Sequence, residues 1–240
     1  MKWMTPVYQW LSFNHPGQQG SCSLCADRTR EGLDLCRQCR SELPTNSSAC
    51  RLCAHPLPAG AAPICGSCLH RPPPFSAFAP FLYAQPLDRL IIELKFQGRL
   101  YLGRTLGMLL ADAVASQAPA MPDLLVPVPL HPARLRERGY NQAVELARPV
   151  GRRLGLPVAD AARRTRATPG QAGLSAKERR RNVRGSFEAV APNRLKGKRV
   201  AIVDDVFTTG ATATEMANCL KRAGAASILI WTLARTPGKD

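Results

Sequence analysis

Residues 200–212 read Val-Ala-Ile-Val-Asp-Asp-Val-Phe-Thr-Thr-Gly-Ala-Thr. The segment begins with a run of apolar residues, continues with two adjacent acids, Asp204 and Asp205, and ends in a turn rich in Thr and Gly. The apolar run predicts a buried strand, and the residues after the turn have the apolar spacing of a helix. A strand that leads through a turn into a helix is the repeating unit of parallel α/β sheets.

The turn has the composition of a phosphate-binding site. Thr208, Thr209 and Thr212 offer hydroxyl donors. Gly210 lets backbone amides approach an anion closely, and the start of the following helix adds a partial positive charge. The turn therefore predicts a cradle for one phosphate group. The acidic pair before it would lie over the same edge of the sheet, where it could accept hydrogen bonds from sugar hydroxyls or help to hold a divalent cation.

Other classes of site share parts of this pattern. Receiver domains also end a strand with two acids, but near the start of the domain, whereas this pair lies close to the end of the sequence. A Walker loop requires Gly-Lys-Ser/Thr and a dinucleotide fold requires GxGxxG, and the turn contains neither. A solvated turn capped by Asp and Thr explains the composition but not the adjacent acids. A phosphate site is the interpretation that explains both.

The rest of the C-terminal part alternates between apolar strands and amphipathic helices. We expect strands at residues 78–83, 124–128, 200–203 and 227–233, and helices at 87–95, 100–115, 141–154 and 212–223. This alternation predicts an α/β domain with a mostly parallel sheet flanked by helices. Right-handed crossovers place the carboxyl ends of the strands along one rim, where such sheets bind ligands.

The cysteines are concentrated at the other end of the sequence. Eight of the nine precede residue 70 as four CxxC pairs, with gaps of ten, ten and eleven residues between the pairs: Cys22 and Cys25, Cys36 and Cys39, Cys50 and Cys53, Cys65 and Cys68. Two such pairs supply the four thiolates of a structural zinc site, so we expect two zinc ions. Neighbouring pairs sharing one ion, cross-braced pairs and nested pairs all fit the spacing. Redox chemistry typically uses a single CxxC, and disulfides require an oxidising compartment.

Two histidines and the ninth cysteine are given ordinary roles. His55 and His70 are interpreted as surface residues, because the thiolates complete both metal sites. Cys219 lies in an apolar helical pattern and is interpreted as a core residue.

A proline run marks the expected domain boundary. Arg71 is followed by three prolines, which neither a helix nor a central strand tolerates. We therefore expect an N-terminal segment at 1–21, a small double zinc ribbon at 22–71, and an α/β domain at 72–240.

Charge and hydropathy restrict the class of partner and the compartment. Of the 240 residues, 33 are Lys or Arg and 17 are Asp or Glu, which gives a net charge of +16 and favours a phosphorylated ligand or a polyanion. No apolar stretch reaches the length of about 20 residues that a membrane helix needs, so we expect no membrane insertion. Residues 1–20 lack the pattern of a secretory signal, which predicts a cytoplasmic protein.

The segment 200–212 resembles, over its whole length, the 5-phosphoribosyl-1-pyrophosphate (PRPP) motif of type I phosphoribosyltransferases. With the cysteine module in front, the sequence from Cys22 to Arg235 is similar to the ComF/GntX family, which is associated with competence and DNA utilisation. The resemblance implies that Asp204 and Asp205 contact the ribose hydroxyls of PRPP and act in catalysis, and that the turn holds its 5'-phosphate. The PRPP-binding residues it implies are Val203, Asp204, Asp205, Val206, Phe207, Thr208, Thr209, Gly210, Ala211 and Thr212.

Two further segments fit the same resemblance. A proline-rich strand end stands where the family has its pyrophosphate loop, and the following Arg-Gly-Tyr-Asn-Gln is a family signature. Residues 164–182 match the family pattern of a flexible loop that closes over PRPP. The residues implied for pyrophosphate binding and closure are Pro127, Val128, Pro129, Leu130, Arg138, Asn141, Arg164, Arg166, Gln171 and Arg179, with Arg136 as a candidate catalytic residue.

The implied function is binding of PRPP with Mg²⁺. The resemblance leaves open whether the phosphoribosyl group is then transferred, and it does not identify the acceptor. Few residues follow the last predicted strand, so the sequence offers no element that reads a nucleobase. The alternative is a non-catalytic competence factor on the same scaffold. Its partner would be single-stranded DNA, favoured by the arginine clusters, or a helicase-type competence protein docked by the zinc ribbon. Aromatic residues make up only 6% of the chain, which leaves few stacking platforms for DNA.

Overall fold

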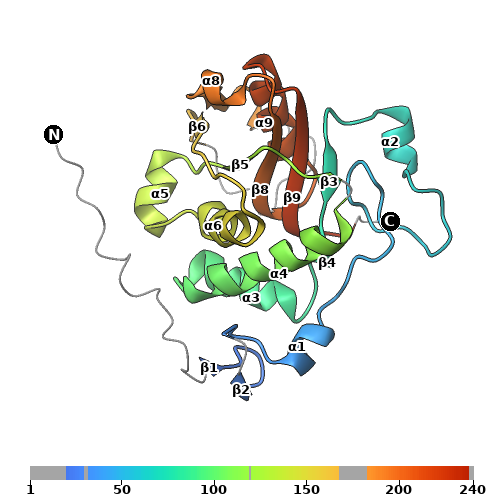
Figure 1. Cartoon of the computed structure of the whole chain (residues 1–240), viewed down its shortest axis with the longest axis vertical. Coiled ribbons are helices and arrows are strands. Elements are labelled where there is room, and N and C mark those ends of the chain that lie inside the picture. Colours follow the sequence, from blue (N-terminus) through green and yellow to red (C-terminus); the bar gives the residue numbers. More distant parts are fainter. Residues whose placement is uncertain (1–19, 30–31, 119, 168–182, 238–240) are drawn as a thin grey trace. The chain divides into compact units, whose positions relative to one another are not determined.

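The predicted strand at 200–203 is part of a longer strand, β8 (Arg199–Phe207), inside a parallel sheet (Figure 1). The structure, a computed structural model, describes residues 20–29, 32–118, 120–167 and 183–237. Within these ranges the sheet has the order β3-β9-β8-β5, and β4 also pairs with β9. Its other strands are β3 (Ser76–Phe78), β4 (Phe81–Leu82), β5 (Leu124–Pro127) and β9 (Ser227–Arg235). All pairings between the strands of this sheet are parallel, which confirms the predicted α/β class.

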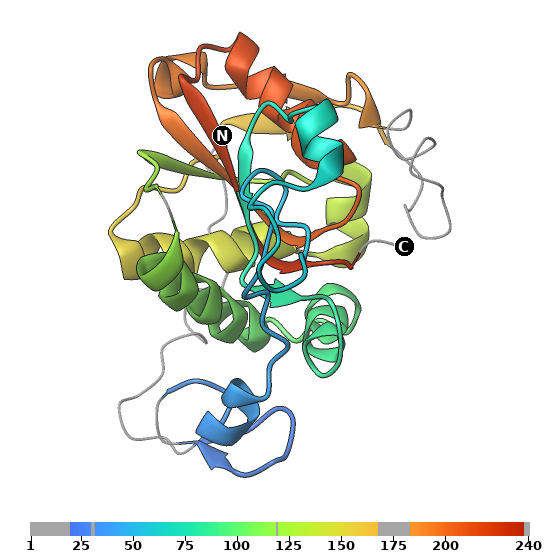
Figure 2. The ribbon, with the colours of Figure 1, turned by 90° about the vertical axis from the view of Figure 1, so that its right-hand side faces the viewer.

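Helices cover both faces of this sheet (Figures 1 and 2). Helix α9 (Ala211–Arg222) places Met216 and Leu220 in a core with Ile202 of β8 and Ile230 of β9. Helices α4 (Tyr101–Gln117) and α6 (Gln142–Leu154) pack against each other, with α4 next to β9 and α6 next to β8. Because successive strand residues point to opposite faces, this arrangement determines which helices each acidic side chain of β8 meets.

The contact between α4 and α6 depends on glycine. A Cβ atom on Gly107 would lie 2.4 Å from Cγ of Pro149 and 2.8 Å from the carbonyl oxygen of Leu146. Gly103 is similarly close to Glu145. The two helices therefore approach closely because α4 presents backbone where other helices present side chains.

Most expected elements are present, with differences at the edges of the domain. The single strand expected at 78–83 is two short strands, β3 and β4, separated by Ala79 and Pro80, and Pro80 has no amide hydrogen for a sheet hydrogen bond. The basic residues after β5, for which the sequence indicated no element, form a helix, α5 (Pro132–Arg138). The remaining elements of this part are α3 (Leu87–Phe96), β6 (Ala162–Arg164), β7 (Phe187–Ala189) and α8 (Pro192–Leu195). Strands β6 and β7 form a separate antiparallel pair.

The cysteine pairs are divided between two compact units, one ending at Leu43 and the other beginning at Pro44. The first unit contains β1 (Gly20–Ser21), β2 (Arg28–Thr29) and α1 (Arg37–Ser41). The second contains helix α2 (Gly66–His70) together with the α/β sheet. The boundary expected near Pro72 separates the cysteine motifs from the α/β motifs in the sequence. The two compact units of the structure, in contrast, meet between Leu43 and Pro44 along the chain. No helix among the described residues is long and apolar enough to span a membrane.

Candidate functional site

The predicted phosphate turn connects the end of β8 to the start of α9. Gly210 precedes the helix with a backbone φ of +73°, a left-handed conformation that favours glycine. Its backbone also lies against the ring of Phe207, since a Cβ atom there would be 2.9 Å from Cζ of that ring. Thr209 is exposed, and Thr208 and Thr212 are half-buried. The turn thus places hydroxyls and the first amides of a twelve-residue helix at the carboxyl edge of the sheet.

The two acids before the turn lie on opposite faces of the sheet. Asp205 is buried and its Oδ2 lies 2.6 Å from Nζ of Lys95, at the end of helix α3. Asp204 is half-buried and interacts electrostatically with Arg164 of β6. Each carboxylate also accepts a hydrogen bond from the next backbone amide, at 2.9 Å for Asp204 and 2.8 Å for Asp205. Both carboxylates are therefore held at the same edge by different elements.

Lys95 is a site residue that the sequence analysis did not identify. Its side chain is 22% exposed and that of Asp205 is 4% exposed. Burial lowers the pKa of Lys95, but the Asp205 and Asp204 carboxylates outweigh burial and raise that pKa above its usual value. A signal was present: Leu87, Ile91 and Lys95 are spaced four residues apart, so the lysine continues the buried face of α3.

The protonation of Asp204 depends on the same two neighbours, Asp205 and Lys95. Burial and the neighbouring Asp205 carboxylate raise the pKa of Asp204 to about 8, although Lys95 acts in the opposite direction. Burial and the Asp205 charge therefore favour the protonated form of Asp204 in the absence of a ligand. A ligand that donates hydrogen bonds to this carboxyl group would favour its ionised form.

The segment expected to bind pyrophosphate is tied to the same edge. The amide of Val128 donates to the carbonyl of Val203 at 2.9 Å, which extends the sheet by one hydrogen bond. Asn141 donates from Nδ2 to the carbonyl of Val128 at 2.9 Å and accepts from the amide of Ala143 at 3.0 Å, which caps α6. Asn141 therefore fixes the start of this segment to its end. The segment 127–142 leaves the sheet next to the acids and contains helix α5.

The arginines of this segment have different environments. Arg136 is exposed. Arg138 donates to Oε1 of Gln142 at 2.5 Å and lies over the ring of Phe96, with its Cζ 5.2 Å from the ring centre. Arg134 is close enough to Arg164 to lower the pKa of that guanidinium. Pro129 and Leu130 are half-buried, whereas Pro127 and Val128 are buried.

The base of the expected closing loop is the β6–β7 pair. The Arg164 guanidinium lies over the Phe187 ring at 5.5 Å, and burial lowers the pKa of Arg164, with Arg134 acting in the same direction and Asp204 in the opposite one. Arg166 donates to the carbonyl of Arg184 at 3.3 Å. Arg164 thus joins β6 to the acidic edge. Gln171 and Arg179 lie outside the described residues.

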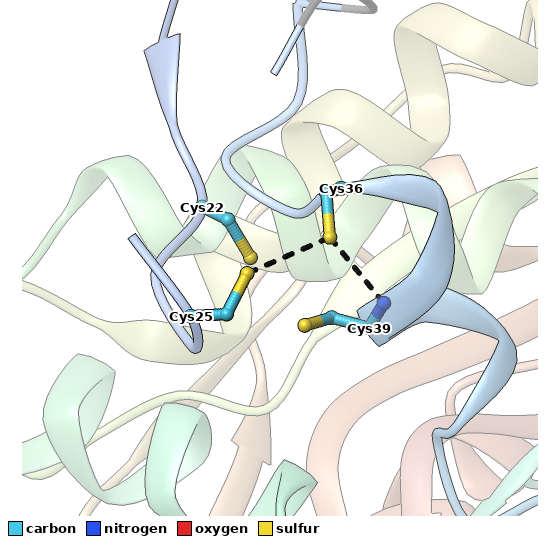
Figure 3. A group of neighbouring side chains, drawn as sticks. All are labelled: Cys22, Cys25, Cys36 and Cys39. Carbon is cyan, nitrogen blue, oxygen red and sulfur yellow. Dashed lines mark hydrogen bonds between the residues drawn. The ribbon is translucent and has the colours of Figure 1, made fainter. Parts of the chain in front are cut away.

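The eight N-terminal cysteines form two groups of four. In the first unit, the sulfur atoms of Cys22, Cys25, Cys36 and Cys39 converge, and in the second those of Cys50, Cys53, Cys65 and Cys68 do so. Within each group the sulfur atoms all lie within 4.8 Å of one another. Figure 3 shows the four side chains of the first group directed toward one point. Of the pairings that the spacing allowed, the structure has the one in which neighbouring CxxC pairs share a site.

The distances and charges in both groups fit zinc. Cys25 and Cys36 have their sulfurs 3.7 Å apart, as do Cys53 and Cys65, and a tetrahedral zinc with bonds of about 2.3 Å separates its sulfur ligands by about 3.8 Å. Burial opposes ionisation of Cys22, but backbone amides facing its sulfur lower its pKa to about 6. Burial and neighbouring thiols raise the pKa of Cys39. Four adjacent thiolates repel one another, and a divalent ion removes that repulsion. Each group is therefore a closed zinc site with a structural role.

Comparison with known proteins gives two family matches. Residues 140–240 match the phosphoribosyl transferase domain, and residues 16–69 match the double zinc ribbon domain. The chain is 39% identical to DNA utilization protein YhgH of Escherichia coli K12 over 226 residues, which is 92% of each protein. It is 36% identical to competence protein F of Haemophilus influenzae over 228 residues, covering 92% of this chain and 93% of that protein.

A solved structure of lower similarity is purine phosphoribosyltransferase from Pyrococcus horikoshii. It has 22% sequence identity and a TM-score of 0.32, covering 54% of this chain and 70% of that one.

Proposed function

The chain belongs to the family of DNA utilization protein YhgH and competence protein F, and we propose that its α/β domain binds PRPP with Mg²⁺ at the β8–α9 turn. The ComF/GntX resemblance of the sequence is thereby confirmed at the level of the family. The observation that carries the proposal is the left-handed Gly210 at the start of α9, directly after an acidic pair at the strand end. The phosphoribosyl transferase domain match spans the same residues.

The turn supplies what a 5'-phosphate needs. The first amides of α9 have no partner within the helix, and Thr208, Thr209 and Thr212, all within two residues of Gly210, add hydroxyl donors. The helix terminus adds a favourable partial charge for an anion. Gly210 allows the turn to pack closely on Phe207, because any Cβ atom there would meet that ring.

The acids supply what the ribose needs. Asp204 and Asp205 are acceptors for the ribose hydroxyls, and Lys95 holds Asp205 in place. When bound with PRPP, Mg²⁺ neutralises charge on the pyrophosphate. Arg164 of β6 interacts electrostatically with Asp204 and with Arg134 of the segment 127–142, and these two arginines would bind the pyrophosphate as it leaves. No covalent nucleophile is required, since positioning and charge stabilisation carry such a transfer.

Within this proposal the chain transfers the phosphoribosyl group to a nitrogen nucleophile, in the context of DNA uptake or utilisation that the names of its relatives indicate. It would work in the cytoplasm, because two groups of free thiolates persist as zinc ligands in a reducing compartment.

The test is calorimetric titration of the zinc-loaded chain with PRPP and Mg²⁺, with ribose 5-phosphate in parallel. We expect micromolar binding of PRPP that the Asp204→Asn/Asp205→Asn variant loses. The exposed Asp160→Asn variant is the matched control and should bind as the unmodified chain does. Absence of binding by folded, zinc-loaded protein would refute the proposal, as would equal binding by the double variant. A positive result justifies a search for the acceptor by pyrophosphate release.

A second candidate function, contact with single-stranded DNA, is favoured by exposed aromatic residues next to arginines. Phe96 is 69% exposed and Tyr101 is 46% exposed. Arg138 lies over Phe96, and Nη1 of Arg99 is 3.5 Å from the hydroxyl of Tyr101. Exposed rings beside guanidinium groups are platforms for unstacked bases, each worth about 1–3 kcal/mol. Docking of a helicase-type competence protein stays a prediction without assigned residues.

Fluorescence anisotropy with a labelled oligothymidine tests this second function. The Phe96→Ala/Tyr101→Ala variant should bind at least about tenfold more weakly than the unmodified chain. The control variant Ile92→Ala should bind as the unmodified chain does. Equal affinity of the double variant and the unmodified chain would exclude this surface.

A further inference from the structure

The second zinc site is connected to the phosphate turn through one buried arginine. Arg235, the last residue of β9, is 9% exposed. Its Nε donates to the carbonyl of Cys53 at 3.2 Å. Its Nη1 donates to the carbonyl of Phe207 at 3.2 Å and to that of Thr236 at 2.6 Å. One guanidinium group therefore bridges a zinc-ligand loop and the residue that precedes the phosphate turn.

A buried guanidinium needs a compensating charge nearby. Burial lowers the pKa of Arg235, and all four cysteines of the second zinc site act against that effect. A zinc ion with four thiolates carries a net charge of about −2. Among the described residues, Arg235 makes no ion pair with an acidic side chain. The zinc-thiolate group is thus the anionic partner that the surroundings of this arginine provide.

The ring of Phe207 continues the connection to the phosphate turn. The guanidinium of Arg235 lies 5.0 Å from the centre of this ring, and the ring of Phe75 packs edge-on at 6.0 Å. The ring also approaches Gly210, where it would contact any Cβ atom. Phe207 therefore forms the floor under the turn, and Arg235 fixes that floor both by its hydrogen bond and by its position over the ring.

Backbone contacts make the second cysteine group part of the α/β domain. The amide of Ala77 in β3 donates to the carbonyl of Leu52 at 3.1 Å, between two zinc ligands. The amide side chain of the buried Asn46 donates to the carbonyls of Ala54 and Ala79 at 3.0 and 3.1 Å. The first cysteine group belongs to the other compact unit, which ends at Leu43. The two zinc sites therefore differ in their relation to the sheet, although their sequences are alike.

We propose that Arg235 is a positioning residue that couples zinc occupancy of the Cys50/Cys53/Cys65/Cys68 site to the shape of the phosphate turn. Loss of this zinc removes the charge that holds Arg235, releases Phe207 and weakens phosphate binding at residues 208–212. Loss of the first zinc leaves the turn unchanged. The inference rests on the proposed function for its ligand, but the coupling itself is a property of the protein without ligand.

The experiment compares matched cysteine variants in the two sites, Cys25→Ala and Cys53→Ala, each the second cysteine of its CxxC pair. Zinc content is measured by elemental analysis, affinity for PRPP with Mg²⁺ by calorimetry, and amide exchange over residues 203–214 by mass spectrometry. Both variants should lose one zinc ion. Only Cys53→Ala should speed exchange in the turn and lower PRPP affinity, by at least about tenfold, as expected for a disrupted outer-shell contact.

Arg235→Met is the second variant, and it keeps all eight zinc ligands. We expect its second zinc to be held about 10- to 100-fold more weakly, with faster exchange in the turn and unchanged retention of the first zinc. Arg235→Lys, which keeps the charge, should restore part of the zinc retention. Far-ultraviolet circular dichroism and unchanged exchange in β9 establish that each variant is folded.

The outcomes separate the two proposals. If the unmodified chain does not bind PRPP, the proposed function fails, and exchange in the turn still decides the coupling. If PRPP binds but Cys53→Ala and Arg235→Met leave both affinity and exchange unchanged, the coupling is refuted while the proposed function stands. Equal effects of Cys25→Ala and Cys53→Ala would also refute it, because the coupling would then not pass through Arg235.

Discussion

The ion pair between Lys95 and Asp205 joins the stability of the domain to its ligand site. The Lys95 Nζ and Asp205 Oδ2 atoms are 2.6 Å apart, with side-chain exposures of 22% and 4%. At an effective dielectric constant of about 20 this distance gives an attraction of about 6 kcal/mol, which desolvation of both groups largely offsets. Lys95→Met leaves a buried carboxylate without its cation. Because such losses cost about 3–5 kcal/mol and Lys95 is partly exposed, we expect a loss of about 3 kcal/mol.

A double-mutant cycle measures this effect. Urea unfolding of the zinc-loaded chain is followed by circular dichroism for Lys95→Met, Asp205→Asn and the combined variant. The combined variant removes both charges and should recover most of the loss, which gives a coupling of about 2–3 kcal/mol between the two positions. The exposed pair Arg163 and Glu188, at 2.8 Å, is the control, and Arg163→Met should cost less than about 1 kcal/mol.

The result that refutes this reasoning is specific. If Lys95→Met costs less than about 1 kcal/mol and adds to Asp205→Asn without coupling, the two residues do not form a buried pair. The same variants also report on the ligand. Lys95→Met should weaken PRPP binding, because Asp205 is no longer held toward the carboxyl edge of β8.

Three further predictions follow from single contacts. Gly210→Ala should cost about 1–2 kcal/mol for its left-handed backbone and should also weaken PRPP binding, as urea unfolding and calorimetry would show; unchanged values would mean that the turn has another conformation. A Gly→Ala change raises stability in an exposed helix, but Gly107→Ala should lower it by about 1–3 kcal/mol because the methyl group meets Pro149. A higher free energy of urea unfolding would contradict the close contact between the helices. Burial raises the pKa of Asp204 to about 8, above its value in the unfolded chain. The folded protein should therefore hold an extra proton at pH 7, and its stability should fall as the pH rises toward 8. PRPP binding should release that proton. Calorimetry in buffers of different ionisation enthalpy measures the release, which Asp204→Asn should abolish; equal release by both proteins would assign the proton elsewhere.

The central sheet was predictable because its signals are local. Apolar runs such as 200–203 and 227–233 are typical of buried strands, and four CxxC pairs predict two groups of four thiolates, although their spacing left the pairing open. The division into two compact units between Leu43 and Pro44 was not predictable from such local signals. The residues that attach the second zinc site to the sheet, such as Asn46 and Arg235, are single polar side chains whose partners lie far away in the sequence.

The candidate site shows the same contrast. The turn at 208–212 is a contiguous motif, so its place at the end of β8 follows from the sequence. Lys95 acts on Asp205 from a different element, and a single lysine in an amphipathic helix usually faces solvent. The opposite orientations of Asp204 and Asp205 follow from strand alternation, but the partners on each face depend on which helix or strand covers it. Helix α5 was not predicted because four of its seven residues are charged and none is buried, so it lacks the apolar spacing of an amphipathic helix.

The most direct test of the account is a crystal structure of the zinc-loaded chain with PRPP and Mg²⁺ at concentrations that saturate its calorimetric titration. The account predicts the 5'-phosphate on the amides at the start of α9, next to the hydroxyls of Thr208, Thr209 and Thr212, with the ribose hydroxyls at Asp204 and Asp205. PRPP bound at any other place, with this turn free of phosphate, would contradict it.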